Sequence, residues 1–201
     1  MSWTDDFSDS SLDSTLFGTS VAGAGSVAEG AATLTISGGA TATDAAIVYL
    51  KAKLDQAINE TFTHKVRATA INSGGSVELL IAVDKGSAPA VANAATVVSQ
   101  IRIGVRQLAT GNIYLYYYNT AGTPQWWTGT AFSATVTVAY AGAVNTYYTV
   151  QLVHTTTQFQ LVLLDAAGTT ELARTTLVNF SALKSTYANL YVCWGDQYTD
   201  F

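Results

Sequence analysis

The sequence predicts an all-β protein, built as a sandwich of two antiparallel sheets. Many short segments alternate hydrophobic and polar residues with a period of two, which is typical of strands. Glycines and small polar residues separate these segments, and helical periodicity is scarce. Without a helical layer, each sheet must bury its hydrophobic face against the other sheet. The length of 201 residues suits one such unit, so we expect a single domain over 1–201.

The predicted strands follow one another along the chain. In order they are 61–71, 77–84, 100–107, 112–118, 147–154, 158–165 and 170–177. The run 77–84 is continuously apolar, as a strand buried on both sides would be. The last three predict an antiparallel meander, with a hairpin turn over 165–168 in which Gly168 is free to take a positive φ.

One segment, 44–58, fits both helix and strand. Leu50, Leu54 and Ile58 have helical spacing, whereas residues 47–50 alone are equally good strand. The pattern leaves both structures open.

The composition restricts the classes of function. Charged residues make up 11% of the chain and the net charge is −5, without a basic tail or a Lys/Arg-rich helix. We therefore do not expect the protein to bind nucleic acid, because phosphate contacts need clustered positive charge. A surface of small polar residues suits an assembly or an extracellular setting, although β proteins also favour Thr and Val for backbone reasons.

Several further features are expected to be missing. Cys193 is the only cysteine, so neither an intrachain disulfide nor a cysteine-based zinc site is expected. The first residues lack the pattern of a secretory signal, and no apolar stretch reaches 18 residues, so we expect no membrane insertion. No cofactor motif is present. Asp5, Asp6, Asp9 and Asp13 predict a solvated acidic segment, with Ca²⁺ binding left open.

Three features resemble the concanavalin A-like lectin/glucanase superfamily. The chain opens with Trp-Thr-Asp-Asp-Phe at 3–7, followed by Leu-Asp at 12–13 and Leu-Thr-Ile at 34–36. The meander from Tyr147 through Gly168 looks like the paired strands of the superfamily, and the chain ends with Leu-Tyr-Val-Cys-Trp-Gly at 190–195 and Asp200-Phe201. The resemblance implies a jelly-roll sandwich whose final strand returns beside the first. It does not by itself imply a function.

The sequence does not offer the carboxylates of a glycosidase. Retaining enzymes hold two carboxylates about 5–5.5 Å apart, and the glucanase branch of the superfamily has a Glu-x-Asp-x-x-Glu strand. The nearest candidates here, Glu78 and Asp84, would be about 20 Å apart on one strand. The two histidines, His64 and His154, belong to no catalytic motif. We therefore expect a protein that is not an enzyme.

The densest aromatic region is the candidate binding surface. Tyr114, Tyr116 and Tyr118 share one strand face, and a hairpin loop over 119–125 returns Trp126 and Trp127 beside them. Aromatic rings stack on sugars and also anchor protein interfaces. Glycan binding, a contact between subunits and ordinary packing remain open, and consecutive Trp residues must point to opposite faces.

A basic stripe is a second candidate feature. Lys65, Arg67, Arg102 and Arg106 lie on the polar faces of two predicted strands. If these strands are neighbours, the stripe could meet an acidic partner surface; a solvated sheet face is the simpler interpretation.

Two functions follow as expectations. The first is a non-enzymatic virion structural, decoration or tail attachment protein, a homo-oligomer that contacts other virion proteins or copies of itself and also a cell-surface glycan. Low charge, no disulfide and no export signal favour it. The alternative is a carbohydrate-binding module of a bacterial surface or secreted protein, which the fold resemblance and the aromatic region favour.

Overall fold

The computed structural model describes residues 12–30, 33–38, 44–51, 58–71, 73, 75–84, 101–183 and 190–197. The regular structure of these residues is β, apart from one 3₁₀ turn, η2 (Phe180–Ala182). The strand pairs are antiparallel. The expected fold of two antiparallel sheets is therefore confirmed. No helix in this part of the chain is long and apolar enough to cross a membrane.

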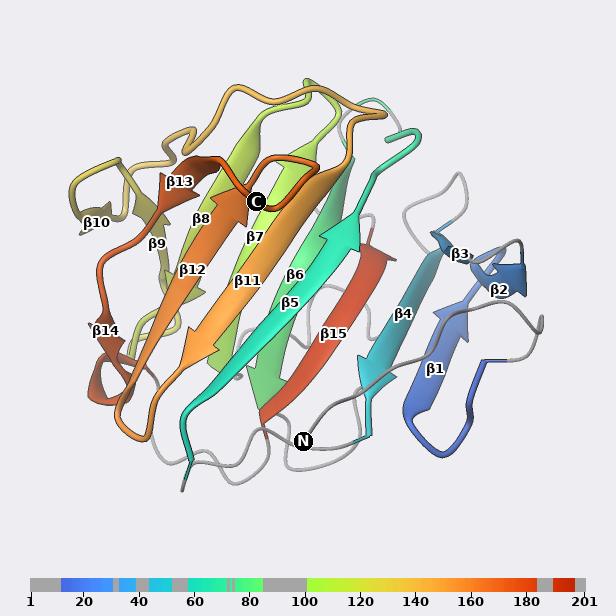
Figure 1. Cartoon of the computed structure of the whole chain (residues 1–201), viewed down its shortest axis with the longest axis horizontal. Coiled ribbons are helices and arrows are strands. Elements are labelled where there is room, and N and C mark those ends of the chain that lie inside the picture. The colour runs from blue at the N-terminus through green and yellow to red at the C-terminus, as the bar shows by residue number, and fades with distance from the viewer. Residues whose placement is uncertain are drawn as a thin grey trace.

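The larger sheet has eight strands in the order β1-β4-β15-β6-β7-β8-β9-β10 (Figure 1). They are β1 (Phe17–Ala22), β4 (Ala45–Leu50), β15 (Leu190–Gln197), β6 (Ser76–Asp84), β7 (Ile101–Leu108), β8 (Ile113–Tyr118), β9 (Pro124–Trp127) and β10 (Phe132–Ser133). The C-terminal strand β15 lies between β4 and β6, so β4 separates it from β1. The opening segment 3–7, expected beside the final strand, lies outside the described residues.

The smaller sheet lies in front of the larger one in Figure 1. Its strands run in the order β13-β12-β11-β5, with β14 also paired to β12. The bounds are β5 (Glu60–Val66), β11 (Tyr148–His154), β12 (Gln158–Leu164), β13 (Glu171–Arg174) and β14 (Val178–Asn179). The expected meander is thus confirmed as β11-β12-β13.

The turn between β12 and β13 has the expected chemistry. Gly168 takes a φ of 72°, and the Asp165 carboxylate accepts the Thr169 backbone N–H at 2.9 Å. The following strand is shorter than the predicted 170–177. It ends at Arg174 because the Thr175 hydroxyl, in place of a backbone carbonyl, accepts the Leu161 N–H at 3.1 Å.

The segment that fitted both helix and strand contains a strand. Its first half is β4, which pairs with β1 on one side and β15 on the other. Burial of almost every residue of β4 explains why strand is favoured, since two flanking strands and two packed faces outweigh a helical spacing of three residues. Residues 52–57 lie outside the described part.

The core lies between the two sheets. The larger sheet contributes side chains such as Val48, Leu80 and Leu115, and the smaller sheet contributes Leu152 and Phe159. The hairpin of β2 (Ser26–Gly30) and β3 (Thr33–Ser37) packs Val27, Leu34 and Ile36 onto the same core and contacts β4 and β15. Each large apolar side chain that becomes buried contributes about 1.5–3 kcal/mol, so this interior is the main source of stability.

One histidine crosses this interior. His64 on β5 has its Nε2 2.7 Å from the Leu79 carbonyl oxygen on β6, and the Trp194 indole on β15 donates to the same nitrogen at 2.6 Å. A β-bulge in β6, between Glu78 and Leu80, brings this carbonyl to the ring. Burial lowers the pKa of His64 to about 4, so the imidazole is neutral at pH 7.

We predict that acid destabilises the fold through His64. The pKa is about 4 in the folded chain and about 6.5 when unfolded, so the unfolded chain binds the extra proton. The contribution is fully present above pH 6.5 and is lost as the pH falls towards 4, by about 3 kcal/mol in total. Unfolding in urea at pH 7.5 and pH 4.5 measures it.

His64→Gln is the control, because it keeps a polar side chain that does not titrate. Its free energy of unfolding should fall less than that of the wild type between these two pH values. Equal losses in both proteins would contradict the assignment.

Candidate functional site

The outer face of the larger sheet brings most of the predicted site together. Backbone register aligns one row across all eight strands, consisting of Gly18, Tyr49, Cys193, Ile81, Gly104, Tyr116, Trp126 and Ser133. The next row of register partners includes Glu78, Arg106 and Tyr114, where the bulge in β6 places Glu78 three residues from Ile81. Segments far apart in the sequence thus meet on one surface, which we call the outer face.

Glycines let aromatic rings lie flat on the outer face. A Cβ on Gly18 would lie 2.2 Å from Cζ of Tyr49, and a Cβ on Gly104 would lie 2.8 Å from Oη of Tyr116. Each ring therefore occupies the space over a glycine of the neighbouring strand. Glycine inside a strand commonly marks such a close approach.

Four of the five predicted binding residues form one aromatic cluster. The ring centroids of Tyr116 and Trp126 are 5.2 Å apart, those of Tyr114 and Trp126 are 5.8 Å apart, and those of Tyr116 and Tyr118 are 5.9 Å apart. Trp127 points into the core between the sheets, where its ring centroid lies 5.2 Å from that of Phe132. The rule of opposite faces for consecutive tryptophans therefore holds.

The members of the cluster differ in exposure. Tyr116 is fully buried and Trp126 exposes 1% of its surface, whereas Tyr118 is half-buried. Tyr49, at the other end of the row, is also half-buried and packs edge-on against Tyr191. In this conformation, Tyr118 and Tyr49 are the rings that a ligand could touch; Tyr118 packs on the cluster of Tyr116 and Trp126, and Tyr49 packs on Tyr191. Whether the five predicted residues bind a ligand stays a prediction.

A buried ion pair lies beside the aromatic cluster. Nε of Arg106 donates to Oε1 of Glu78 at 2.7 Å, and a second guanidinium nitrogen contacts the same oxygen. The Tyr116 hydroxyl donates to that oxygen at 2.9 Å. Burial acts to lower the pKa of Arg106, but the Glu78 charge, Tyr116 and the hydrogen bond to Glu78 together raise it above its ordinary value. Arg106 is therefore charged at any working pH.

A glycosidase site would need a second carboxylate close to Glu78. Glu78 pairs in register with Arg106, and Asp84 pairs with Ile101, five residues further along β7. These backbone positions are about 17 Å apart. Glu78 and Asp84 therefore do not form a two-carboxylate site with each other, as expected. Applied from Glu78, the Glu-x-Asp-x-x-Glu pattern would place its other two carboxylates at positions 80 and 83, which are Leu and Val.

The predicted basic stripe is wrong. Lys65 belongs to β5 of the smaller sheet and Arg67 follows that strand, whereas Arg102 and Arg106 belong to β7 of the larger sheet. Alternation placed Lys65 and Arg67 on the exposed side correctly, but it could not tell that the strands lie in different sheets or that Arg106 is buried against Glu78.

The acidic N-terminal segment lies mostly outside the described residues. Of its four aspartates only Asp13 is described, and its Oδ1 accepts the backbone N–H and the hydroxyl of Thr15, both at 2.7 Å. These hydrogen bonds lower the pKa of Asp13. Among the described residues, no group of three or more His, Cys, Asp or Glu side chains could hold a metal ion.

Comparisons with known proteins identify the fold. No protein-family model matches the chain, and no curated protein matches it. A structure from members of the human gut microbiota, described in terms of endo-acting O-glycanases that initiate mucin breakdown, is 13% identical with a TM-score of 0.63. It covers 98% of this chain and 85% of its own.

Two mycobacterial structures are also similar. A β-1,3-glucanase from Mycobacterium marinum is 12% identical with a TM-score of 0.57, over 95% of this chain and 84% of its own. A glycosyl hydrolase family 16 protein from Mycobacterium smegmatis is 8% identical with a TM-score of 0.54, over 95% and 86%. The fold is therefore a concanavalin A-like jelly-roll sandwich, as the resemblance implied.

These matches overturn the main functional expectation. The chain was expected to be a virion structural, decoration or tail attachment protein without enzymatic activity. The similar structures are instead glycan-cleaving proteins by description, and nothing in the comparisons points to a virion or a phage. The expectation depended on low charge, small surface residues and the lack of a disulfide and of an export signal pattern, none of which is specific to virion proteins. The alternative, carbohydrate binding, fits the comparisons better.

We predict that removing one partner of the Glu78–Arg106 pair destabilises the fold more than replacing both partners with apolar residues. Glu78→Ala leaves the Arg106 charge buried without its carboxylate and should cost about 3–5 kcal/mol of folding free energy. The double variant Glu78→Leu, Arg106→Met should recover most of that loss, because no buried charge is left. Chemical unfolding of Glu78→Leu, Arg106→Met and the double variant measures the coupling, and strictly additive losses would contradict it.

Proposed function

We propose that this protein is carbohydrate-active and binds a glycan along the outer face of the larger sheet. The observation that carries the proposal is the row of aromatic rings laid over glycines, next to a buried polar centre of Glu78, Arg106 and Tyr116. Sugar rings stack on flat aromatic surfaces, and their hydroxyls need fixed polar partners. The fold matches support it, since their descriptions name glucanase and O-glycanase activities. An extracellular or bacterial-surface setting goes with this proposal.

The exposed rings are the proposed contacts. Tyr118 and Tyr49 are half-buried, so either ring can lose further solvent exposure to a sugar. Tyr116 and Trp126 lie too deep to stack directly in this conformation, and their role is to orient Tyr118, which packs on them.

Glycan binding should therefore separate from stability. Tyr118→Ala should weaken binding of soluble β-1,3-glucan or mucin about tenfold and leave the fold nearly unchanged, whereas Trp126→Ala should cost about 3–5 kcal/mol because its ring is buried. Calorimetric titration with each glycan, together with thermal unfolding, measures both effects.

Tyr147→Ala is the matched control, since Tyr147 is an exposed tyrosine outside the outer face. It should leave binding of the neutral β-1,3-glucan intact. Equal loss in both tyrosine variants, or no binding of any glycan, would overturn the proposal.

A second candidate function is hydrolysis of glycosidic bonds. Glu78 favours it, because it is a carboxylate near the middle of the outer face. The Arg106 guanidinium and the Tyr116 hydroxyl both donate hydrogen bonds to it. A nucleophile or general base must be a carboxylate of this kind, and a second carboxylate about 5–9.5 Å away would have to act as the acid.

Release of reducing ends from β-1,3-glucan or mucin tests this activity. Glu78→Gln keeps the size of the side chain and removes its charge, so it should lower the rate at least about a hundredfold. If the wild type and Glu78→Gln release product at the same rate, Glu78 takes no part in the reaction.

A further inference from the structure

The outer side of the smaller sheet has a second concentration of polar groups, which we call the opposite face. Its register rows contain Lys65 with Thr149, and Thr63 with Gln151, Val162 and Arg174. The Gln151 amide donates to the Thr63 hydroxyl at 3.2 Å. This face points away from the core and from the larger sheet, so it is separate from the proposed glycan site.

Three side chains meet at one corner of the opposite face. The Lys65 ammonium lies 5.1 Å from the centroid of the Tyr147 ring, and the Arg67 guanidinium carbon lies 4.5 Å from the same centroid. Tyr147 is 37% exposed, and both cations are exposed. Two like charges around one ring repel each other, and the π-system of the ring offsets part of that repulsion.

These two cations lack a carboxylate partner among the described residues. The other described basic side chains are occupied: Arg106 by Glu78, Arg174 by Glu171, and Lys51 by the Ser14 carbonyl. Lys65 and Arg67 therefore form a local positive site in an acidic protein.

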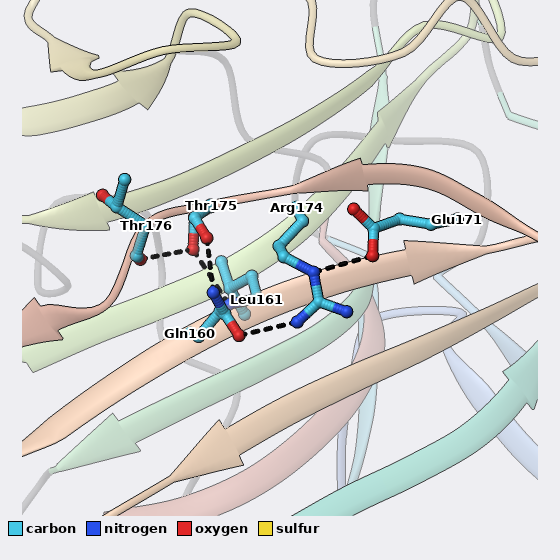
Figure 2. A network of polar contacts seen from close by, with 6 residues as sticks. All are labelled: Gln160, Leu161, Glu171, Arg174, Thr175 and Thr176. Carbon is cyan, nitrogen blue, oxygen red and sulfur yellow. Dashed lines mark hydrogen bonds and ion pairs between the residues drawn. The ribbon is translucent and has the colours of Figure 1, made fainter.

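A separate polar network joins β12 to β13 and the residues that follow it, at the far edge of this face (Figure 2). Arg174 donates to Glu171 at 2.7 Å and to the Gln160 side-chain oxygen at 2.9 Å, and the Gln160 amide donates to the Thr175 carbonyl at 2.6 Å. The network fixes these side chains in place. An ordered surface of amide and guanidinium groups loses little entropy when it binds a polar ligand.

We propose that the opposite face is a second glycan site, selective for sugars that carry a carboxylate or a sulfate, with its anionic subsite at Lys65, Arg67 and Tyr147. Arg67 offers two parallel donors to a planar carboxylate or to sulfate oxygens, and Lys65 adds a point charge. The Tyr147 ring supplies the stacking surface for the sugar that bears the anion. The proposal takes from the proposed function only that the ligands are glycans.

Binding of three polymers tests the second site: polygalacturonate for carboxylate, dextran sulfate for sulfate, and uncharged dextran. The wild type should prefer one or both acidic polymers over dextran, with an affinity that falls as salt is raised. The Lys65→Gln, Arg67→Gln double variant should lose about tenfold or more on the preferred polymer, and Tyr147→Ala should lose binding as well. The acidic polymer whose affinity falls more in the double variant identifies the anion that the site prefers.

Lys51→Gln is the matched control, because it removes one charge by the same substitution at a distant exposed site. It should change the affinity less than twofold, whereas Lys65→Gln alone should change it more. Equal effects of the two single variants would mean unspecific attraction and overturn the site, as would no preference for acidic polymers.

The two sites can fail separately. Binding of β-1,3-glucan that depends on Tyr118, without any acidic preference, overturns the second site and leaves the proposed function standing. If acidic polymers bind through Lys65 and Arg67, but Tyr118→Ala does not change the binding of β-1,3-glucan, the second site is supported and the first is overturned.

Discussion

The mutual burial of two inner sheet faces is the constraint on which this structure depends. Side chains such as Val105 and Leu161 have no contact with water because each sheet covers the other. The eight-stranded sheet is wider than the sheet that packs on it, and the β2–β3 hairpin adds Leu34 and Ile36 to the same core. Since the inner faces provide most of the stability, the two outer faces are free to carry unusual residues.

Two polar arrangements buried in the described part of the chain have specific partners. Glu78 and Arg106 neutralise each other under the aromatic cluster, and His64 stays neutral between the Leu79 carbonyl and Trp194. An isolated buried charge would be far costlier than either arrangement. Both arrangements begin at the same short stretch of β6, where a β-bulge turns Glu78 outward and lets the Leu79 carbonyl reach the core. A single irregularity thus supplies the outer face and the interior with their polar centres.

The two outer faces suit different ligands. On the larger sheet, glycines make room for flat rings, and the charges are buried and paired. On the smaller sheet, an exposed ring lies among exposed cations, and an amide and guanidinium network lies at the far edge of the same face. The first arrangement favours neutral sugar surfaces and the second favours anions. Under the two proposals, the outer face binds neutral sugars and the opposite face binds acidic ones.

The sequence by itself determined the all-β class, the meander with its Gly168 turn and the opposite directions of Trp126 and Trp127. Alternation and turn chemistry are local, so they survive without knowledge of the partner strands. Only the tertiary structure decided that Lys65 and Arg106 lie in different sheets and that Glu78 meets Arg106 and Tyr116. Strand order and the bulge in β6 set those neighbours, and both depend on pairing between segments far apart in the chain. The same long-range pairing decided which aromatic rings are buried, and so which of the five predicted binding residues can reach a ligand.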